Sequence, residues 1–299
     1  LGFTGITWST SKRFKADGWQ IHTAGLFDID QATKTCRASS FAGIWASDNG
    51  HFALSVSPAK DTSKDDIRSV ASWFAAAGRN IGGPDALSPH TSLAGTPYEY
   101  GPAASELQDI PIAAASSQLF EAKWFGRLPT HPIQSTLSRT GQGTLRGTLT
   151  SQLQTPLQDC VLMHAGWLYD VGTLHPGKTF DLDAGRGPKS LGAVLTKKRA
   201  VKDRNVSARW KSDDRDIIRI LEVAGMHRAA GGSEYTGLQS GRLEHIDMTH
   251  LLVLNRIILI GKGPPATKWI PHKKAEPKDK GFEDAGNTTL WRIVLEVRN

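Results

Sequence analysis

The chain has few of the residues that build covalently linked or metal-centred folds. Among 299 residues it carries 2 cysteines, Cys36 and Cys160. Two cysteines are too few for a disulfide framework and match no metal-ligand spacing. They fit either one bridge in an oxidising compartment or two small buried hydrophobic residues, which is the usual role of a free cysteine.

Long hydrophobic runs are also missing. The longest strongly apolar stretch, Leu251 to Ile260, is interrupted by Asn255 and Arg256, whereas a membrane-spanning helix needs about 18 or more apolar residues. The chain shows no signal-peptide pattern. We therefore expect the chain to be soluble. Because it begins at Leu1 instead of methionine, we also expect it to be a piece of a longer protein.

Catalytic signatures are scarce as well. The sequence has no His-Glu-x-x-His, Gly-x-Ser-x-Gly or Ser-x-x-Lys pattern. His245 and His250 lie five residues apart around Asp247, which is not a helical ligand pair, and His227 near Gly231-Gly232 is typical of a structural histidine. The sequence therefore predicts no catalytic, cofactor-binding or metal-binding residues.

Two pairs of aspartates could nevertheless do acid–base chemistry or bind calcium. Asp28 and Asp30 share one strand face, as do Asp181 and Asp183. At strand ends such carboxylates are more typical of solvated edges that discourage strand pairing, and this is the interpretation we favour.

What the sequence does contain is alternation of apolar and polar residues. Such period-two patterns are typical of antiparallel sheets with one wet face. They occupy five stretches: 21–30, 52–56, 119–125, 145–153 and 291–298. The clearest is the last, where Trp291, Ile293, Leu295 and Val297 face one way and Arg292, Glu296 and Arg298 mostly face the other.

Helical signals are fewer. Asp213 and Asp214 suit a helix N-terminus, apolar residues at helical spacing follow, and Gly225 suits the end. Asp65 to Ala77 is a weaker helix candidate. The sequence predicts a mainly β fold of antiparallel, Ig-like sandwich architecture, in the form of two packed sandwiches with one or two short helical insertions.

A rise in proline and glycine between Gly126 and Gly143 predicts a domain boundary. We expect an N-terminal β-sandwich domain over 1–130 and a C-terminal one over 140–299, the latter with a basic and helical insertion at 184–232. Further loops are marked by Gly82-Gly83-Pro84, Gly101-Pro102 and Gly263-Pro264-Pro265.

The net charge of +7 permits an acidic partner. Much of the excess lies between Lys189 and Lys211, which is typical of a solvated surface and lacks any nucleic-acid motif. The 9 tryptophans are scattered from Trp8 to Trp291 and are therefore expected mainly in the core. Exposed tryptophans gathered on one face would instead favour glycan binding.

One segment matches a nucleotide-binding pattern letter for letter. Gly172 to Thr179 reads G-x-x-x-x-G-K-T, which is the pattern of a phosphate-binding loop. A true phosphate-binding loop also needs a strand before it and a helix after it. A strand over Cys160–Tyr169 is plausible, but the alternation in Phe180 to Asp183 and the following Gly185, Gly187 and Pro188 oppose a helix. We interpret the segment as a Pro-Gly turn that joins two antiparallel strands.

Several short segments together carry a resemblance that spans most of the chain. They are Leu26–Asp30, Leu107–Ile112 followed by Lys123-Trp124, Pro156–Leu162, Trp167–Tyr169 followed by Gly172–Gly177, and Leu254–Gly261. These resemble the extracytoplasmic region of large membrane-anchored proteins of planctomycete-type bacteria. The resemblance implies an envelope location, membrane helices elsewhere in the protein and no catalytic residues to carry over.

The leading hypothesis is a non-enzymatic extracytoplasmic envelope module that binds another protein or an acidic or glycan surface polymer. It needs no cofactor, and it touches the membrane only through segments outside this chain. One rival is a hydrolase of an envelope polymer, which would need Asp28, Asp30, His227 or His245 to converge in a cleft. The other is a nucleotide-binding protein that uses Lys178 and Thr179.

Overall fold

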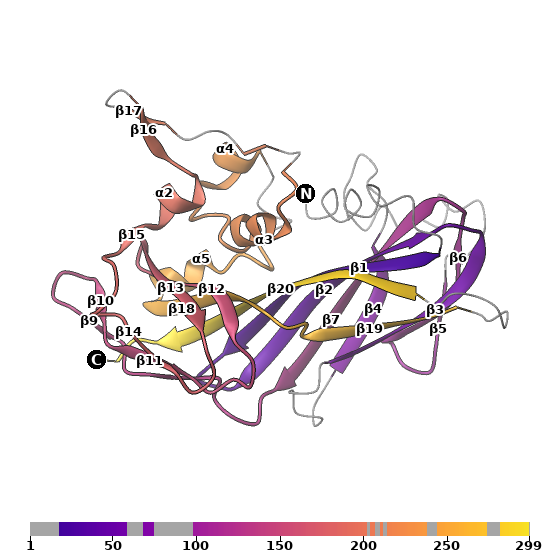
Figure 1. Ribbon diagram of the computed structural model, residues 1–299, viewed down its shortest axis with the longest axis horizontal. Coiled ribbons are helices and arrows are strands. Elements are labelled where there is room, and N and C mark those ends of the chain that lie inside the picture. Colours follow the sequence, from indigo (N-terminus) through magenta and orange to yellow (C-terminus); the bar gives the residue numbers. More distant parts are fainter. Residues whose placement is uncertain are drawn as a thin grey trace.

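The computed structural model of the chain describes residues 18–58, 68–74, 98–201, 204–206, 210–211, 214–237, 244–273 and 282–298. Strands dominate, and the helices are few and short (Figure 1). The predicted mainly β, antiparallel sandwich fold with short helical insertions is confirmed. None of the helices in the described ranges is long and apolar enough to cross a membrane.

The fold is organised around a sheet of nine strands in the order β15, β13, β12, β18, β20, β1, β2, β7, β4. In that order the strands are β15 (Lys189–Ser190), β13 (Trp167–Leu174), β12 (Leu157–His164), β18 (Arg256–Gly263), β20 (Phe282–Glu296), β1 (Trp19–Asp30), β2 (Thr35–Ala46), β7 (Ser116–Arg127) and β4 (Arg68–Phe74). The first and last of the described strands, β1 and β20, lie side by side at its centre and run parallel.

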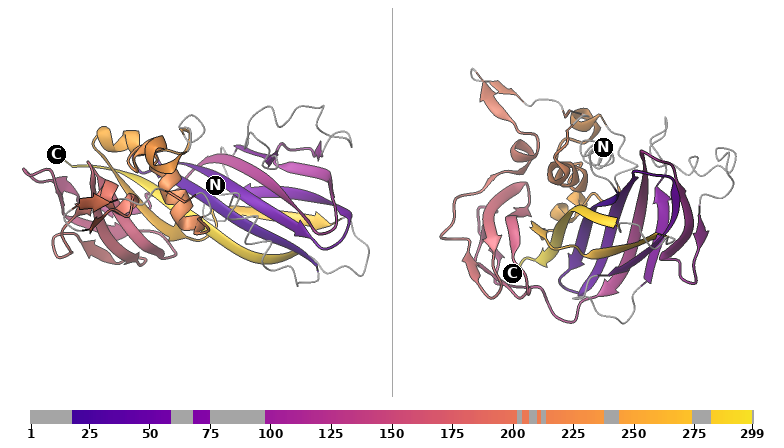
Figure 2. Two further views of the ribbon diagram at one scale, coloured as in Figure 1. Left: turned by 90° about the horizontal axis from the view of Figure 1, so that it is seen from above. Right: turned by 45° about the vertical axis from the view of Figure 1, so that its right-hand side comes forward.

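One face of this sheet is covered by two smaller sheets, one at each end of β1 (Figure 2). The four-stranded sheet is made of β19 (Thr267–Lys273), β3 (Gly50–Pro58), β6 (Glu106–Ile112) and β5 (Glu99–Tyr100). The three-stranded sheet is made of β14 (Thr179–Asp181), β11 (Thr148–Ser151) and β8 (Ile133–Ser135). Two further two-stranded sheets pair β9 (Ser138–Arg139) with β10 (Leu145–Arg146), and β16 (Arg199–Val201) with β17 (Arg204–Val206).

The period-two pattern of β1 explains how one strand serves both sandwich cores. Trp19 and Ile21 pack under the four-stranded sheet, and Phe27 and Ile29 pack under the three-stranded sheet. All four side chains lie on the same sheet face, because alternate residues of a strand point the same way. The boundary predicted between 1–130 and 140–299 stays a prediction. Strands from both sides of it share the large sheet, and β19 pairs with β3.

The opposite face of the large sheet is covered by helices at the β12, β18 and β20 end (Figure 1). They are α2 (Leu191–Leu195), α3 (Ile217–Gly225), α4 (Gly232–Thr236) and α5 (Thr249–Val253). The helix predicted to end at Gly225 is confirmed as α3, although its N-cap is Asp216, whose side chain accepts the N–H of Arg219. The predicted insertion at 184–232 contains α2 and α3.

Three sequence expectations about local structure are wrong. Residues 68–74 of the helix expected over Asp65–Ala77 form strand β4, because pairing with β7 outweighs the weak helical pattern; the rest of that segment lies outside the described residues. Leu153 lies beyond the end of β11. Arg292, expected on a wet face, is 0% exposed, because helices cover that face of β20.

Cys36 and Cys160 are free and buried, so of the two possibilities left open by the sequence the structure has two buried thiols. Both belong to the core under the three-stranded sheet. Burial raises the pKa of each thiol to about 11.

Candidate functional site

The nucleotide-like segment Gly172–Thr179 is a turn between two strands. Gly172 to Leu174 belong to β13 and Thr179 begins β14, so a strand follows where a phosphate loop needs a helix. The N–H of Gly177 donates to Ser151 O (2.9 Å) and that of Lys178 to His175 O (3.1 Å), so these amides do not face an open cradle. The predicted turn is confirmed, with one correction: β13 and β14 pair in different sheets and not with each other.

Asp28 has a structural role that the sequence did not indicate. The guanidinium of Arg292 binds both of its oxygens (Nε–Oδ1 2.6 Å, Nη2–Oδ2 2.8 Å), and Arg37 Nε adds a bond of 2.8 Å. Burial alone would raise the pKa of Asp28, but the two arginines reverse this and hold it below its ordinary value. The expectation of a solvated edge carboxylate is wrong here, because β1 is a central strand and Asp28 is only 8% exposed.

The other residues singled out from the sequence lie at separate places in the fold. Asp30 accepts from Ala32 N and Thr33 Oγ1 in the turn after β1. Asp181 accepts from Asp183 N. His227 is 1% exposed, and its Nε2 is hydrogen-bonded to Thr236 Oγ1 at 3.0 Å. The backbone oxygen of His245 accepts from Arg37, and His250 lies in α5.

Most of the described tryptophans are in the core, as expected. Trp19, Trp45, Trp124, Trp210, Trp269 and Trp291 are buried, Trp73 is half-buried and Trp167 is 38% exposed. They therefore form no exposed platform in the described part of the chain. Within those same ranges, no group of three or more His, Cys, Asp and Glu side chains could hold a metal ion.

The basic stretch lies partly in a hairpin that projects from the body of the molecule (Figure 1). Lys197 and Lys198, just before β16, are exposed, as a solvated surface requires. Lys202 and Arg209 lie outside the described residues.

An open cleft lies where strand β18 ends. Gly263 is the last residue of β18, and a Cβ there would lie 2.4 Å from Trp291 Nε1, so only glycine fits. The indole Nε1 of Trp291 donates to Pro264 O at 2.9 Å. Pro264 and Pro265 cannot donate ladder hydrogen bonds, and the chain leaves the large sheet here to begin β19 in the four-stranded sheet.

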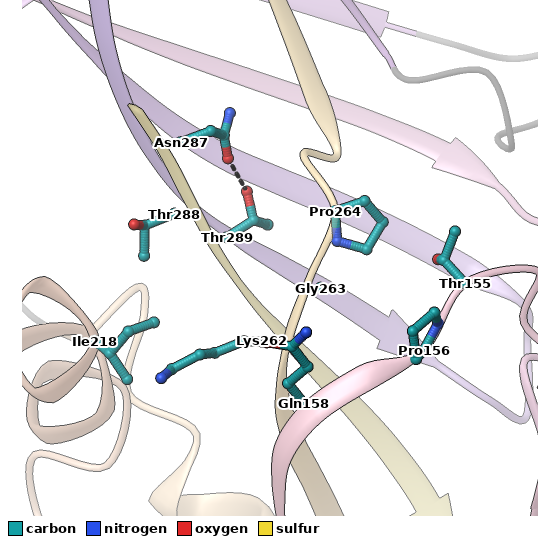
Figure 3. Close-up of a pocket in the computed structure, with 10 residues that line it drawn as sticks. All are labelled: Thr155, Pro156, Gln158, Ile218, Lys262, Gly263, Pro264, Asn287, Thr288 and Thr289. Carbon is teal, nitrogen blue, oxygen red and sulfur yellow. Dashed lines mark hydrogen bonds between the residues drawn. The ribbon is translucent and has the colours of Figure 1, made fainter. Parts of the chain in front are cut away.

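The cleft has a volume of about 480 Å³, and its lining is polar and apolar in nearly equal parts (Figure 3). Its lining comes from the loop before β12 and the start of β12, the end of β18 and the residue after it, helix α3 and strand β20: Thr155, Pro156, Gln158, Ile218, Lys262, Gly263, Pro264, Asn287, Thr288 and Thr289. Asn287 links two strands, because its Nδ2 donates to Thr23 Oγ1 (2.6 Å) while its Oδ1 accepts from Thr289 Oγ1 (3.1 Å).

Charged groups surround Lys262 at one side of the cleft. Lys262 Nζ donates to Asp159 Oδ2 at 2.7 Å. This bond raises the pKa of Lys262, and the charges of Asp216 and Glu222 raise it further. Partial burial raises the pKa of Glu222, and Arg219, 4.0 Å away, opposes that rise.

Beside the cleft, strand β20 has an edge that β18 does not cover. The pairing of β18 with β20 stops at Gly263 and Thr289. From Phe282 to Thr288, the strand pairs with β1 on one side, and no described strand pairs on the other. Glu283, Asp284, Gly286 and Asn287 are exposed. The cleft and an edge of β20 that no described strand covers thus lie next to each other.

None of the lining residues of the cleft was a predicted site residue. The sequence did mark Gly263-Pro264-Pro265 as a loop, which is the point where β18 ends. It gave no indication that β20 begins seven residues before its β18 pairing, since that depends on the parallel partner β1.

A protein-family model described as "Domain of unknown function (DUF8725)" matches residues 132–231. No curated protein matches the chain. Among solved structures, it is similar to the yeast delta-COP-I mu-homology domain, both alone (TM-score 0.35) and complexed with a Dsl1 WxWxV peptide (TM-score 0.38). In each case 7% of residues are identical, over 93% of this chain and 95% of the other. TM-scores this low support no conclusion about function.

Proposed function

We propose that this chain is a non-enzymatic binding module that takes an extended segment of a partner protein along the open edge of β20 and into the adjoining cleft. The observation that carries the proposal is the stretch Gly286–Thr288, which pairs with β1 on one side, has no described strand on the other side, and borders the cleft. An open strand edge presents backbone N–H and C=O groups to a further strand.

The surroundings of this edge suit a polypeptide. Thr155, Gln158 and Thr288 supply hydroxyl and amide groups, and the side chain of Ile218 supplies an apolar contact. Strand addition draws its affinity from main-chain hydrogen bonds and its specificity from side-chain pockets beside the edge. The cleft would be such a pocket.

The remaining features favour this proposal over the rivals. The tryptophans that a glycan platform would use are mostly buried, and Asp28 is engaged by two arginines instead of facing a substrate. The extracytoplasmic envelope location, which rests on the sequence resemblance alone, is part of the proposal; the partner would then be another envelope protein.

The test is a selection of peptides from a displayed random library, with the whole chain immobilised. Thr288→Trp fills the cleft floor, and Thr173→Trp, at an exposed position of β13, is the matched control. We expect peptides enriched on the native chain to bind the Thr173→Trp variant equally and to lose binding to Thr288→Trp. Backbone amides of residues 282–288 should exchange hydrogen more slowly when peptide is bound. If the selected peptides bound the Thr288→Trp variant as tightly as the native chain, the proposal would be contradicted.

A further inference from the structure

The last residue of β12, His164, is a histidine that the core encloses completely. It is 0% exposed. Its Nδ1 lies 3.3 Å from the backbone oxygen of Arg256 on the neighbouring strand β18. In the described part of the chain, no group is within hydrogen-bonding distance of its buried Nε2. A neutral ring with its proton on Nδ1 fits these surroundings, because Nδ1 then donates to the carbonyl and Nε2 carries no proton that needs an acceptor.

Protonation of His164 would place a second N–H on the ring, at Nε2, where the described residues offer no acceptor. A buried donor that lacks an acceptor is costly, and so is a buried positive charge. Burial lowers the pKa of His164 below its ordinary value of 6.5, the bond to Arg256 O acts in the opposite direction, and the charge of Arg139 on β9 lowers it further.

The charged groups around His164 give an imidazolium little support. The backbone N–H of Leu145 donates to the Tyr169 hydroxyl at 2.8 Å, so the β9–β10 hairpin lies against the face of β12 and β13 on which His164 is placed. Burial raises the pKa of Tyr169, which stays neutral. The charged residues on the neighbouring elements are Arg139 and Arg146 on the hairpin, Asp170 on β13, Lys189 on β15, Arg256 on β18, Glu296 on β20 and Arg298 beyond it.

The two carboxylates among these residues already have cationic partners. Asp170 forms an ion pair with Lys189, and Glu296 forms one with Arg256. A proton on His164 therefore has no carboxylate at hand that would compensate for its charge, and Arg139 opposes it.

The turn after His164 favours opening at this point of the sheet. Ala165 and Gly166 join β12 to β13, and both have positive φ, 45° and 87°. Glycine adopts this conformation readily, whereas the Cβ of alanine makes it unfavourable. Trp167, directly after the turn, is 38% exposed. Opening this end of the hairpin would relieve Ala165 and expose few additional apolar groups there.

We propose that His164 is an acid-sensitive switch in the large sheet, and that its protonation releases the turn end of the β12–β13 hairpin from β18. Opening gives the second N–H of the ring access to water. Histidine suits this role because its charge changes in the mildly acidic range. β12 begins at Leu157 beside the cleft and ends at His164, so the switch lies at the far end of the strand and does not depend on the proposed function.

The switch makes the stability of the fold depend on pH below about 6.5, the ordinary pKa of histidine. Below that pH, the unfolded chain binds a proton at His164 that the folded chain excludes until the pH reaches the lower folded-state value. In this window the equilibrium constant for unfolding should rise by up to about tenfold per pH unit. Asp28 titrates only at lower pH, and Glu222, whose pKa is raised, has the opposite effect on stability.

Two measurements on the whole chain test the proton itself. NMR spectra of the imidazole nitrogens should show that the ring of His164 is still mostly neutral at about pH 6.5. Urea denaturation between about pH 7.5 and pH 5 measures the stability. His164→Asn keeps an N–H donor near the position of Nδ1 but does not titrate, so its stability should depend less on pH than that of the native chain. His175→Asn, at an exposed position, is the matched control and should keep the native dependence.

Hydrogen exchange tests whether the opening is local. On acidification, amides of residues 162–168 and 257–259 should lose protection relative to their intrinsic exchange rates, while amides in β1 and β2 keep theirs. The inference is overturned if His164 is half protonated at or above about pH 6.5 in the native chain, or if His164→Asn keeps the native pH dependence. Equal loss of protection in β1 and β2 would mean global unfolding and would also overturn it. If His164→Asn does not fold, the spectra and the exchange of the native chain decide by the same criteria.

Discussion

The two halves of strand β20 have opposite surroundings although they form one continuous strand. From Thr289 to Glu296 the strand lies between β1 and β18 and is largely buried. From Phe282 to Thr288 no described strand other than β1 pairs with it, and Glu283, Asp284, Gly286 and Asn287 are exposed. The difference is set by the neighbouring strand: β18 ends at Gly263, and two prolines follow.

This comparison shows how one strand is both a buried structural element and a candidate binding edge, with an irregularity in its pairing to β1 between Asp284 and Gly286 in the exposed half. The buried half anchors the strand through Arg292, which reaches Asp28 on β1 and Ile246 O beneath the helices. The exposed half is held in place by the same β1 partner. The edge is thereby presented on a rigid support, as specific binding requires.

The largest loss of stability is expected when Arg292, the buried cation in the half of β20 that lies between β1 and β18, is replaced. Arg292→Met leaves the Asp28 carboxylate buried without its main partner, which should lower the free energy of unfolding by about 3–5 kcal/mol. Arg256→Met, which breaks an exposed ion pair with Glu296, should cost about 1 kcal/mol or less. Urea denaturation measures both. Equal stability of the two variants would show that the buried pair does not anchor β20.

A smaller effect is expected at the boundary between the halves. Gly263→Ala places a methyl group 2.4 Å from Trp291 Nε1, and relieving this overlap should cost about 1–3 kcal/mol. Gly187→Ala, where a Cβ meets nothing within 4 Å, is the control and should change thermal unfolding little. A Gly263→Ala chain as stable as the control would mean that the end of β18 shifts freely.

Lowering the pH should remove the stabilisation that the charge of Asp28 contributes to the fold. Its folded-state pKa lies below the unfolded value of about 3.9, so its charge stabilises the fold above that pH, and the stabilisation is lost as the pH falls through the lower folded-state pKa. The stability gap between the native chain and Asp28→Asn should therefore be constant near neutral pH and narrow below about pH 4. Urea denaturation at a series of pH values measures this gap. If this stability difference did not depend on pH, it would come from packing at Asp28 and not from the charge of its carboxylate.

The smallest effect is expected for the two thiols, which should not react with a thiol reagent while the chain is folded. Cys160 lies beneath β18, since a Cβ at Gly261 would be 2.6 Å from its Sγ. With pKa values of about 11 for both thiols, little thiolate exists at pH 8, and burial excludes reagent. A chromogenic disulfide reagent should react only after urea unfolds the chain. Rapid reaction of Cys160 in the native chain would reveal opening of β18 away from the paired half.

The sequence alone predicted the strands whose alternation is strong, but not their surroundings. Phe120, Ala122 and Trp124 were placed correctly on one face of a strand, because the period of two is local information. Arg292 was assigned to a wet face because charge usually indicates solvent, and the helices that bury it come from a distant part of the sequence.

The candidate site was beyond sequence reasoning for the same reason. The segment Gly263-Pro264-Pro265 correctly predicted a loop, and β18 ends at its first residue. However, that point lies beside a candidate binding edge only because β20 extends past it along a partner strand, β1, that is more than two hundred residues away in the sequence. No local pattern around Asn287 or Thr288 reports such a partner.

The parallel pairing of β1 with β20 also bears on how the molecule is made. Asp28 meets Arg292 across 264 positions of the chain, so the centre of the large sheet closes only after nearly all of these residues have left the ribosome. Contacts of such long sequence separation form slowly, because the intervening loop must close first. Until then, the side of β1 that faces β20 lacks this partner, and unpaired strand edges in folding intermediates are prone to aggregate.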